Sequence, residues 1–197
     1  MRWRLTSSIK EGQKILSQII KMAVRITFED RKFVKSIKEG KFCTAPLFNL
    51  TTKENLEIEW EGILSSNGIS KSKFGDKVSY SFGFKSEDDN CDYGAHLFEC
   101  FQEEKALTGW VFADLVKYNS VYFKLQEKNG AFNATSNLKW SPENIHELPI
   151  TKGQKIVVSA KVNAYFNPEK QICGIYFTVS DVQFNEEDSK TFLSYYK

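Results

Sequence analysis

The chain has 197 residues, of which 41% are hydrophobic and 26% charged, and its formal net charge is +2. This length suits one domain with appended segments, and a content of 16 Phe, 8 Tyr and 4 Trp excludes a chain that is disordered throughout. The nearly neutral charge excludes a generally cationic nucleic-acid-binding protein, but it is compatible with a local basic groove.

Residues 1–21 form a basic N-terminal extension, for which we expect either disorder or an amphipathic helix. A mitochondrial transit peptide is an alternative for this Arg- and Ser-containing segment, whereas the continuous apolar region of a secretory signal is missing. The four cysteines then indicate a reducing compartment. We therefore expect an intracellular protein, cytoplasmic or nuclear, that is not secreted.

The next predicted elements are a short strand at residues 24–28 and a basic segment at residues 31–42. The basic segment interleaves lysine and arginine with Phe and Ile, which fits either a phosphate-tracking segment or an amphipathic turn or helix over one end of the fold. Residues 56–64, LEIEWEGIL, alternate strictly and predict a strand. Its face with Glu57, Glu59 and Glu61 would repel phosphate, so we expect a solvated outer face there.

Residues 65–72 are rich in Gly, Ser and Asn and predict a loop, and residues 73–85 predict a strand. Val78, Tyr80, Phe82 and Phe84 share one face of this strand, opposite small residues. Two interpretations are open. The aromatic face either packs into the core or forms a platform on which bases stack, with lysines on the backbone of the ligand.

Cys91, His96 and Cys100 stand at C-x4-H-x3-C spacing, which partly matches a zinc knuckle. The leading C-x2-C is absent, and apolar residues surround these positions. Ordinary buried thiols are therefore favoured over zinc, and we predict no metal site.

Residues 109–118 predict a strand or short helix, and residues 119–126 a strand on which Tyr122 and Lys124 share one face. The pair combines a polar ring with a cation, which suits contact with a ligand better than a core. Residues 127–130 contain Asn-Gly and predict a tight hairpin turn leading into a partner strand at 131–140. Ser141-Pro142-Glu143 then predicts the start of a short helix, which Leu148-Pro149 would end.

Residues 152–184 predict one long β-hairpin around an Asn-Pro-Glu-Lys turn at 167–170. Ile156, Val158, Val162 and Phe166 would face the core. The other face would carry Ser159, Lys161, Asn163 and Tyr165, a polar, cationic and aromatic set. Long, bent hairpins of this kind are typical of small β-barrels.

No phosphate-binding loop, dinucleotide fingerprint, zinc-protease motif or nucleophile elbow occurs in the chain. The sequence therefore predicts neither an enzyme nor a cofactor.

The strands at 56–64, 73–85 and 119–126 and the long hairpin at 152–184 resemble those of OB-fold single-stranded DNA-binding proteins, including those of phages and large DNA viruses. The resemblance implies a mainly β fold: an OB-like Greek-key barrel with a long C-terminal hairpin and one or two short helices. The corresponding organisation is a basic extension at 1–21, a barrel domain at 22–184, and an acidic and aromatic tail at 185–197.

The resemblance also implies a non-catalytic protein that protects single strands in DNA replication, recombination or repair. Bases would stack on rings while lysines neutralise phosphates. The residues that we predict for these contacts are Lys73, Lys77, Tyr80, Lys85, Tyr122, Lys124, Lys139, Trp140, Lys161 and Tyr165. Alternatives are an RNA-binding module and a β-barrel that binds proteins or serves as a structural component.

Several such proteins recruit replication proteins through an acidic tail closed by an aromatic residue, and the resemblance implies a comparable role for Glu186, Glu187, Asp188, Phe192, Tyr195 and Tyr196. This tail is only briefly acidic and ends in Lys197 rather than in an aromatic residue. The expected partners are thus single-stranded nucleic acid, with DNA favoured over RNA, replication proteins and a second copy of the chain, but no membrane.

Overall fold

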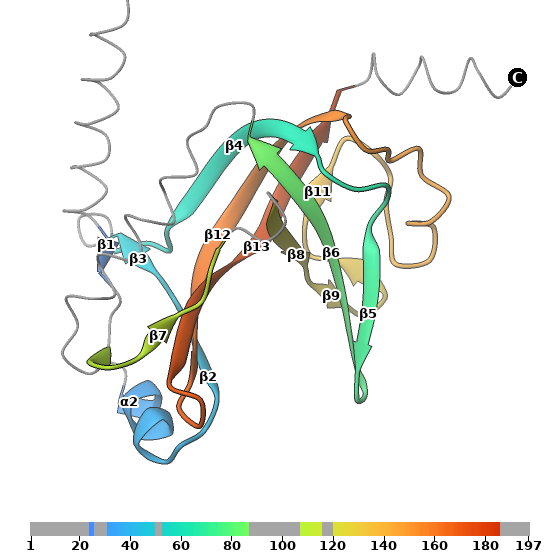
Figure 1. Ribbon diagram of the computed structural model, residues 1–197. Coiled ribbons are helices and arrows are strands. Elements are labelled where there is room, and N and C mark those ends of the chain that lie inside the picture. The colour runs from blue at the N-terminus through green and yellow to red at the C-terminus, as the bar shows by residue number, and fades with distance from the viewer. Residues whose placement is uncertain (1–23, 26–30, 50–52, 87–106, 116–119, 186–197) are drawn as a thin grey trace, which may run out of the picture.

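The structure is a computed structural model that describes residues 24–25, 31–49, 53–86, 107–115 and 120–185 (Figure 1). This part of the chain is mainly β, as the sequence predicts. Its elements are β1 (Val24–Arg25), α2 (Arg31–Lys38), β2 (Cys43–Pro46), β3 (Phe48–Asn49), β4 (Glu57–Leu64), β5 (Ser70–Phe74), β6 (Lys77–Ser86), β7 (Val111–Phe112), β8 (Val121–Leu125), β9 (Glu127–Lys128), β10 (Ala131–Phe132), β11 (Thr135–Ser136), β12 (Lys155–Asn167) and β13 (Ile172–Phe184).

Nine of these strands form one sheet, and five of the nine pair in a closed ring. In the ring, β4 pairs with β6, β6 with β8, β8 with β13, β13 with β12, and β12 with β4 again. Only the β8–β13 pairing is parallel. The ring strands have two faces, and we call the side that points away from the core the outer face.

The long hairpin contributes the two longest strands of the ring, and the prediction of this hairpin is confirmed. β12 and β13 each have 13 residues, and Asn167 caps the turn between them by accepting the Lys170 backbone N–H through Oδ1 at 3.2 Å. The register shifts once, at a bulge between Ser159 and Ala160. Figure 1 shows that this hairpin and the shorter β5–β6 hairpin diverge, so that their turns lie apart, with α2 and β2 beside the long one.

The core lies inside the ring and is filled by rings from alternate positions of its strands. Phe123 is at its centre: the ring centroids of Phe82 and Phe177 lie 5.7 Å and 5.2 Å from its own. Tyr80, Phe82 and Phe84 are all buried, which decides the open question about the aromatic face of residues 73–85 in favour of the core. Burial of such large apolar surfaces is what stabilises the ring.

A glycine in β4 permits the close crossing of β4 and β6. A Cβ atom built on Gly62 would lie 2.2 Å from the Lys85 carbonyl oxygen, closer than atoms approach. The strand therefore needs a residue without a side chain at this point, as glycines in strand interiors often indicate.

Three local predictions were correct. α2 is a helix within the basic segment 31–42, as one of the two interpretations has it. Asn129 and Gly130 have φ of 56° and 78°, the left-handed geometry of the predicted hairpin turn between β9 and β10. The alternating pattern of residues 56–64 corresponds to β4, with Glu57, Glu59 and Glu61 exposed.

Three others were wrong or too long. Residues 70–72 of the predicted loop 65–72 belong to a strand, because β5 pairs with β6 around a turn in which Gly75 has φ of 59°. No helix forms at 141–149. Ser141 and Asn144 bond to each other's backbone and side chains there, and such short-range bonds favour turns over helix. In the predicted segment 109–118, of which the structure describes residues 109–115, Val111 and Phe112 form a strand and the other described residues do not.

Several predictions concern residues outside the described part: the extension 1–21, the Cys91, His96 and Cys100 group, and the tail residues Glu186, Glu187, Asp188, Phe192, Tyr195 and Tyr196. Within the described part, no helix has the length and apolar character needed to cross a membrane.

Candidate nucleic-acid interface

The outer face carries a row of paired residues that crosses all five ring strands. In order across β6, β8, β13, β12 and β4, the row is Ser81, Lys124, Thr178, Lys161 and Glu57. Because paired residues on neighbouring strands project to the same side, these side chains are neighbours. Two of the predicted lysines therefore lie on one face, separated by the single strand β13.

Beside this row lies a second one, built from aromatic side chains, which we call the aromatic row: Tyr122 of β8, Tyr176 of β13, Tyr165 of β12 and Phe42 just before β2. β8 and β13 pair in parallel with Thr178 beside Lys124, which brings Tyr176 beside Tyr122. The Tyr176 and Tyr165 ring centroids are 6.5 Å apart, and those of Tyr165 and Phe42 are 6.4 Å apart with nearly parallel planes.

The ends of the aromatic row are the most accessible. Phe42 is 63% exposed and Tyr122 is 43% exposed, whereas every other aromatic side chain whose burial the structure describes is buried or partly buried. Four neighbouring rings, two of them open to solvent, provide flat apolar surfaces on which a planar ligand can stack.

A glycine sets the position of Tyr165. Gly174 pairs with Tyr165 on the neighbouring strand, and a Cβ atom at residue 174 would lie within 2.7 Å of three atoms of the Tyr165 ring and hydroxyl. The ring therefore lies across the bare backbone of Gly174. This partial burial raises the pKa of the Tyr165 phenol, with a smaller contribution from Cys173.

Lys124 adds a positive charge beside the aromatic row. Its Nζ lies 4.7 Å from the centroid of the Tyr176 ring, within the range of a cation–π interaction. The side chain is exposed overall, but the ammonium lies close enough to the sheet to lose part of its hydration, and this desolvation lowers its pKa.

Lys161 lies where the outer face changes from cationic to acidic. Its Nζ is 3.8 Å from Glu57 Oε1, and both side chains are about half exposed. Glu59 and Glu61 follow on the same face of β4, opposite Ser159 and Val157 of β12. We call Glu57, Glu59 and Glu61 the acidic strip.

The other predicted lysines are divided between the two faces and a loop. Lys77 and Lys85 are exposed and share the outer face of β6 with Ser81. Lys73 pairs with Val78 and thus projects to the opposite face, the side of Tyr80. Lys139 is exposed in the connection between β11 and β12, where its carbonyl oxygen accepts a hydrogen bond from Asn144. Lys73 and Lys139 are therefore not on the outer face.

Two of the four predicted stacking residues are structural. Tyr80 is only 2% exposed and packs edge-to-face on Phe132, with ring centroids 5.1 Å apart. Trp140 packs edge-to-face on Phe132 and Phe184, and its indole N–H donates to the Ala134 carbonyl oxygen at 3.1 Å. Tyr80 lies at a core position of β6 and offers no face for a base, whereas Trp140 is partly buried and its ring is held against the core by these contacts.

Two aromatic residues of the interface were missed by the sequence prediction. Tyr176 lies on the same face of its strand as Gly174 and Thr178, so the alternation of residues 173–179 contained the signal. Phe42 belongs to the basic segment 31–42, but no local pattern indicates that it stacks on a ring 123 positions later.

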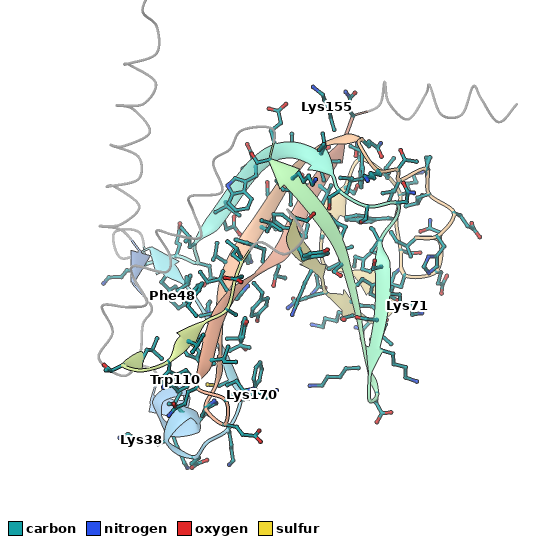
Figure 2. The ribbon with its side chains drawn as sticks, in the orientation of Figure 1. Lys38, Phe48, Lys71, Trp110, Lys155 and Lys170 are labelled. Atoms are coloured by element: carbon teal, nitrogen blue, oxygen red, sulfur yellow. The ribbon has the colours of Figure 1, made fainter. Side chains whose placement is uncertain are left out.

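The lysine side chains do not mark a binding site by themselves, because they are spread over the molecule. Figure 2 shows Lys38 and Lys170 at the turn end of the long hairpin, Lys71 on the β5 arm and Lys155 at the opposite end of the molecule. What distinguishes the interface is thus the aromatic row with Lys124 beside it.

Among the described residues, no group of three or more His, Cys, Asp or Glu side chains could hold a metal ion.

The chain matches no protein-family model, no curated protein and no solved structure.

Proposed function

We propose that the protein binds single-stranded nucleic acid on its outer face, with bases stacking on the aromatic row. The observation that carries this proposal is the row itself: four rings from β8, β13, β12 and the residue before β2, with Lys124 over Tyr176. Stacking on exposed rings is tolerant of base sequence and contributes about 1–3 kcal/mol per base.

The strand order of the ring supports the proposal that this is an OB fold. Numbered along the chain, the five strands follow the order 1-2-3-5-4 and return to 1, with strands 3 and 5 parallel. OB folds bind oligonucleotides on the face of strands 2 and 3, which here are β6 and β8. Tyr122 and Lys124 of β8, with Lys77 and Lys85 of β6, occupy that face.

The proposed function requires that side chains bind the single strand through non-covalent contacts, with no chemical reaction. Lys124, Lys77 and Lys85 would neutralise phosphates, so the affinity should fall as salt rises. Ser81 is a small residue on this face of β6 and leaves room for a backbone to approach beside Lys124, whereas the space over Gly83 is taken by the Ser65 hydroxyl. The resemblance to single-stranded DNA-binding proteins favours DNA as the ligand.

The test is a fluorescence titration of labelled oligo-dT, oligo-U and a blunt duplex at low and moderate salt. We expect tight binding of oligo-dT, weaker binding of the duplex and a linear decrease of log K with log salt. Tighter binding of oligo-U than of oligo-dT would replace DNA by RNA as the ligand.

The variants Tyr122→Ala and Tyr176→Ala should each weaken binding, whereas Val78→Ala serves as the control, since it trims an exposed side chain on the opposite face of β6. Absence of binding to all three oligonucleotides at low salt would overturn the proposal. The exposed rings would then point to a protein ligand.

A further inference from the structure

The register of the outer face places an acidic boundary beside the proposed interface. Lys161 pairs with Thr178 on one side and with Glu57 on the other, so the charges along that row change sign from β12 to β4. Glu59 and Glu61 continue the boundary along β12, and all three carboxylates are exposed. Alternate residues of a strand are about 6.8 Å apart, so the acidic strip presents regularly spaced negative charges.

Lysines border the strip at its two ends: Lys161 pairs with Glu57, and Lys155 and Lys85 both pair with Ile63, two residues beyond Glu61. Lys161 Nζ forms an ion pair with Glu57 Oε1 at 3.8 Å. Glu59 accepts a hydrogen bond from the neutral Ser159 hydroxyl at 3.4 Å. Nearby on β13, Asp181 pairs with Ser159 across the hairpin and adds a further carboxylate on this side of the face.

We infer that the acidic strip limits the interface to one phosphate backbone and so selects single strands over duplex. This inference rests on the proposed function. The strand that carries the strip, β4, lies one strand from β12 and two from β13, a lateral spacing of about 5 and 10 Å. Along β12, the partners of Glu57, Glu59 and Glu61 lie two, four and six residues from Asn163, the partner of Tyr176, which adds a displacement of about 7, 14 and 20 Å. The two backbones of B-DNA are separated by grooves about 6 and 12 Å wide, so a duplex on the aromatic row brings its second backbone to the strip.

A single strand avoids this repulsion. Its bases lie on the aromatic row and its phosphates lie near Lys124, while Lys161 compensates Glu57 at the border. The second backbone of a duplex has no such alternative path, because its position is fixed by base pairing. Like charges about 6 Å apart in water repel by roughly 0.7 kcal/mol, or about threefold in affinity, so Glu59 and Glu61 together reduce duplex binding about tenfold.

The test is the triple variant Glu57→Gln, Glu59→Gln, Glu61→Gln, compared with a control triple variant Glu127→Gln, Glu143→Gln, Glu147→Gln. Both change the net charge equally, and all six side chains are exposed, so neither should unfold the protein. Dissociation constants for oligo-dT and for a blunt duplex are measured at two salt concentrations.

We expect the strip variant to bind the duplex about tenfold more tightly and oligo-dT less than about threefold more tightly, at low salt. In the control variant, both affinities should change by the same small factor. Equal gains for both ligands in the strip variant, or no gain for the duplex, would overturn the inference while oligo-dT binding by the unmodified protein still supports the proposed function. If the unmodified protein binds no oligonucleotide, the proposed function itself fails.

Discussion

Two aromatic clusters of this protein place the same residue types in opposite environments. The inner cluster, Tyr80, Phe132, Trp140 and Phe184, packs edge-to-face at one end of the core. The aromatic row lies on the outer face, where Tyr165 covers a glycine and Phe42 and Tyr122 are open to solvent. For the members that lie on strands, the difference teaches that the environment of an aromatic ring follows from the face of its strand, and the predictions below test that separation.

The largest expected effect is on stability. Tyr80→Ala removes a nearly fully buried ring from the inner cluster and should lower the free energy of unfolding by about 3–5 kcal/mol. Urea denaturation measures it. Tyr122→Ala on the outer face is the matched control and should cost less than about 1 kcal/mol. Equal losses in the two variants would contradict the distinction between the clusters.

The next effect concerns binding. Tyr176→Ala should weaken the binding of oligo-dT by about 1–3 kcal/mol, because it removes both a stacking surface and the ring beneath Lys124. Its urea denaturation should be close to that of the unmodified protein. A folded variant of unchanged affinity would show that bases do not stack on the aromatic row.

A smaller change tests the position of one ring. Gly174→Ala places a Cβ atom where the Tyr165 ring lies, and the ring must turn away from the sheet. We expect oligo-dT binding to weaken by about 1 kcal/mol, at the low end of the contribution of a stacking ring.

A double-mutant cycle distinguishes this mechanism from a general disturbance of β13. In a Tyr165→Ala background, Gly174→Ala should have no further effect on binding, since the ring that it displaces is absent. Additive losses would mean that Gly174→Ala acts on the strand and not through Tyr165.

Much of this organisation could be predicted because alternation is a local property. The pattern of residues 156–166 and 173–179 places Lys161 and Tyr165 on one face and the core residues on the other, as the structure has them. The sequence left open which face of 73–85 is inside, since both faces of that strand contain residues that tolerate burial. Burial of Tyr80 follows from pairing with β8, a contact between distant segments.

Other features depend on distant contacts and could not be read from local patterns. Trp140 lies in an irregular connection, where no strand period assigns a face, and its contacts with Phe132 and Phe184 arise only when the chain has folded. Phe42 reaches Tyr165 because β2 pairs with the end of β12 that lies next to the hairpin turn. Such pairings bring together segments that the periodicity of either one leaves unrelated.

The smallest effect expected on the aromatic row is its dependence on pH. Desolvation lowers the pKa of Lys124 below its ordinary 10.5, so this ammonium loses its charge at a lower pH than an ordinary lysine. Since the charged form binds phosphate, oligonucleotide affinity should decrease as the pH rises from neutral toward 10.5, by about 0.2–1 kcal/mol for this one contact.

Lys124→Arg isolates this contribution, because the guanidinium keeps its charge throughout that range. The difference in affinity between the unmodified protein and the variant, measured by titration from pH 7 to about 10, cancels the ionisation of all other groups. We expect the difference to grow with pH in favour of the variant. A constant difference would mean that Lys124 does not contact the phosphates, and that the aromatic row acts without the cation beside Tyr176.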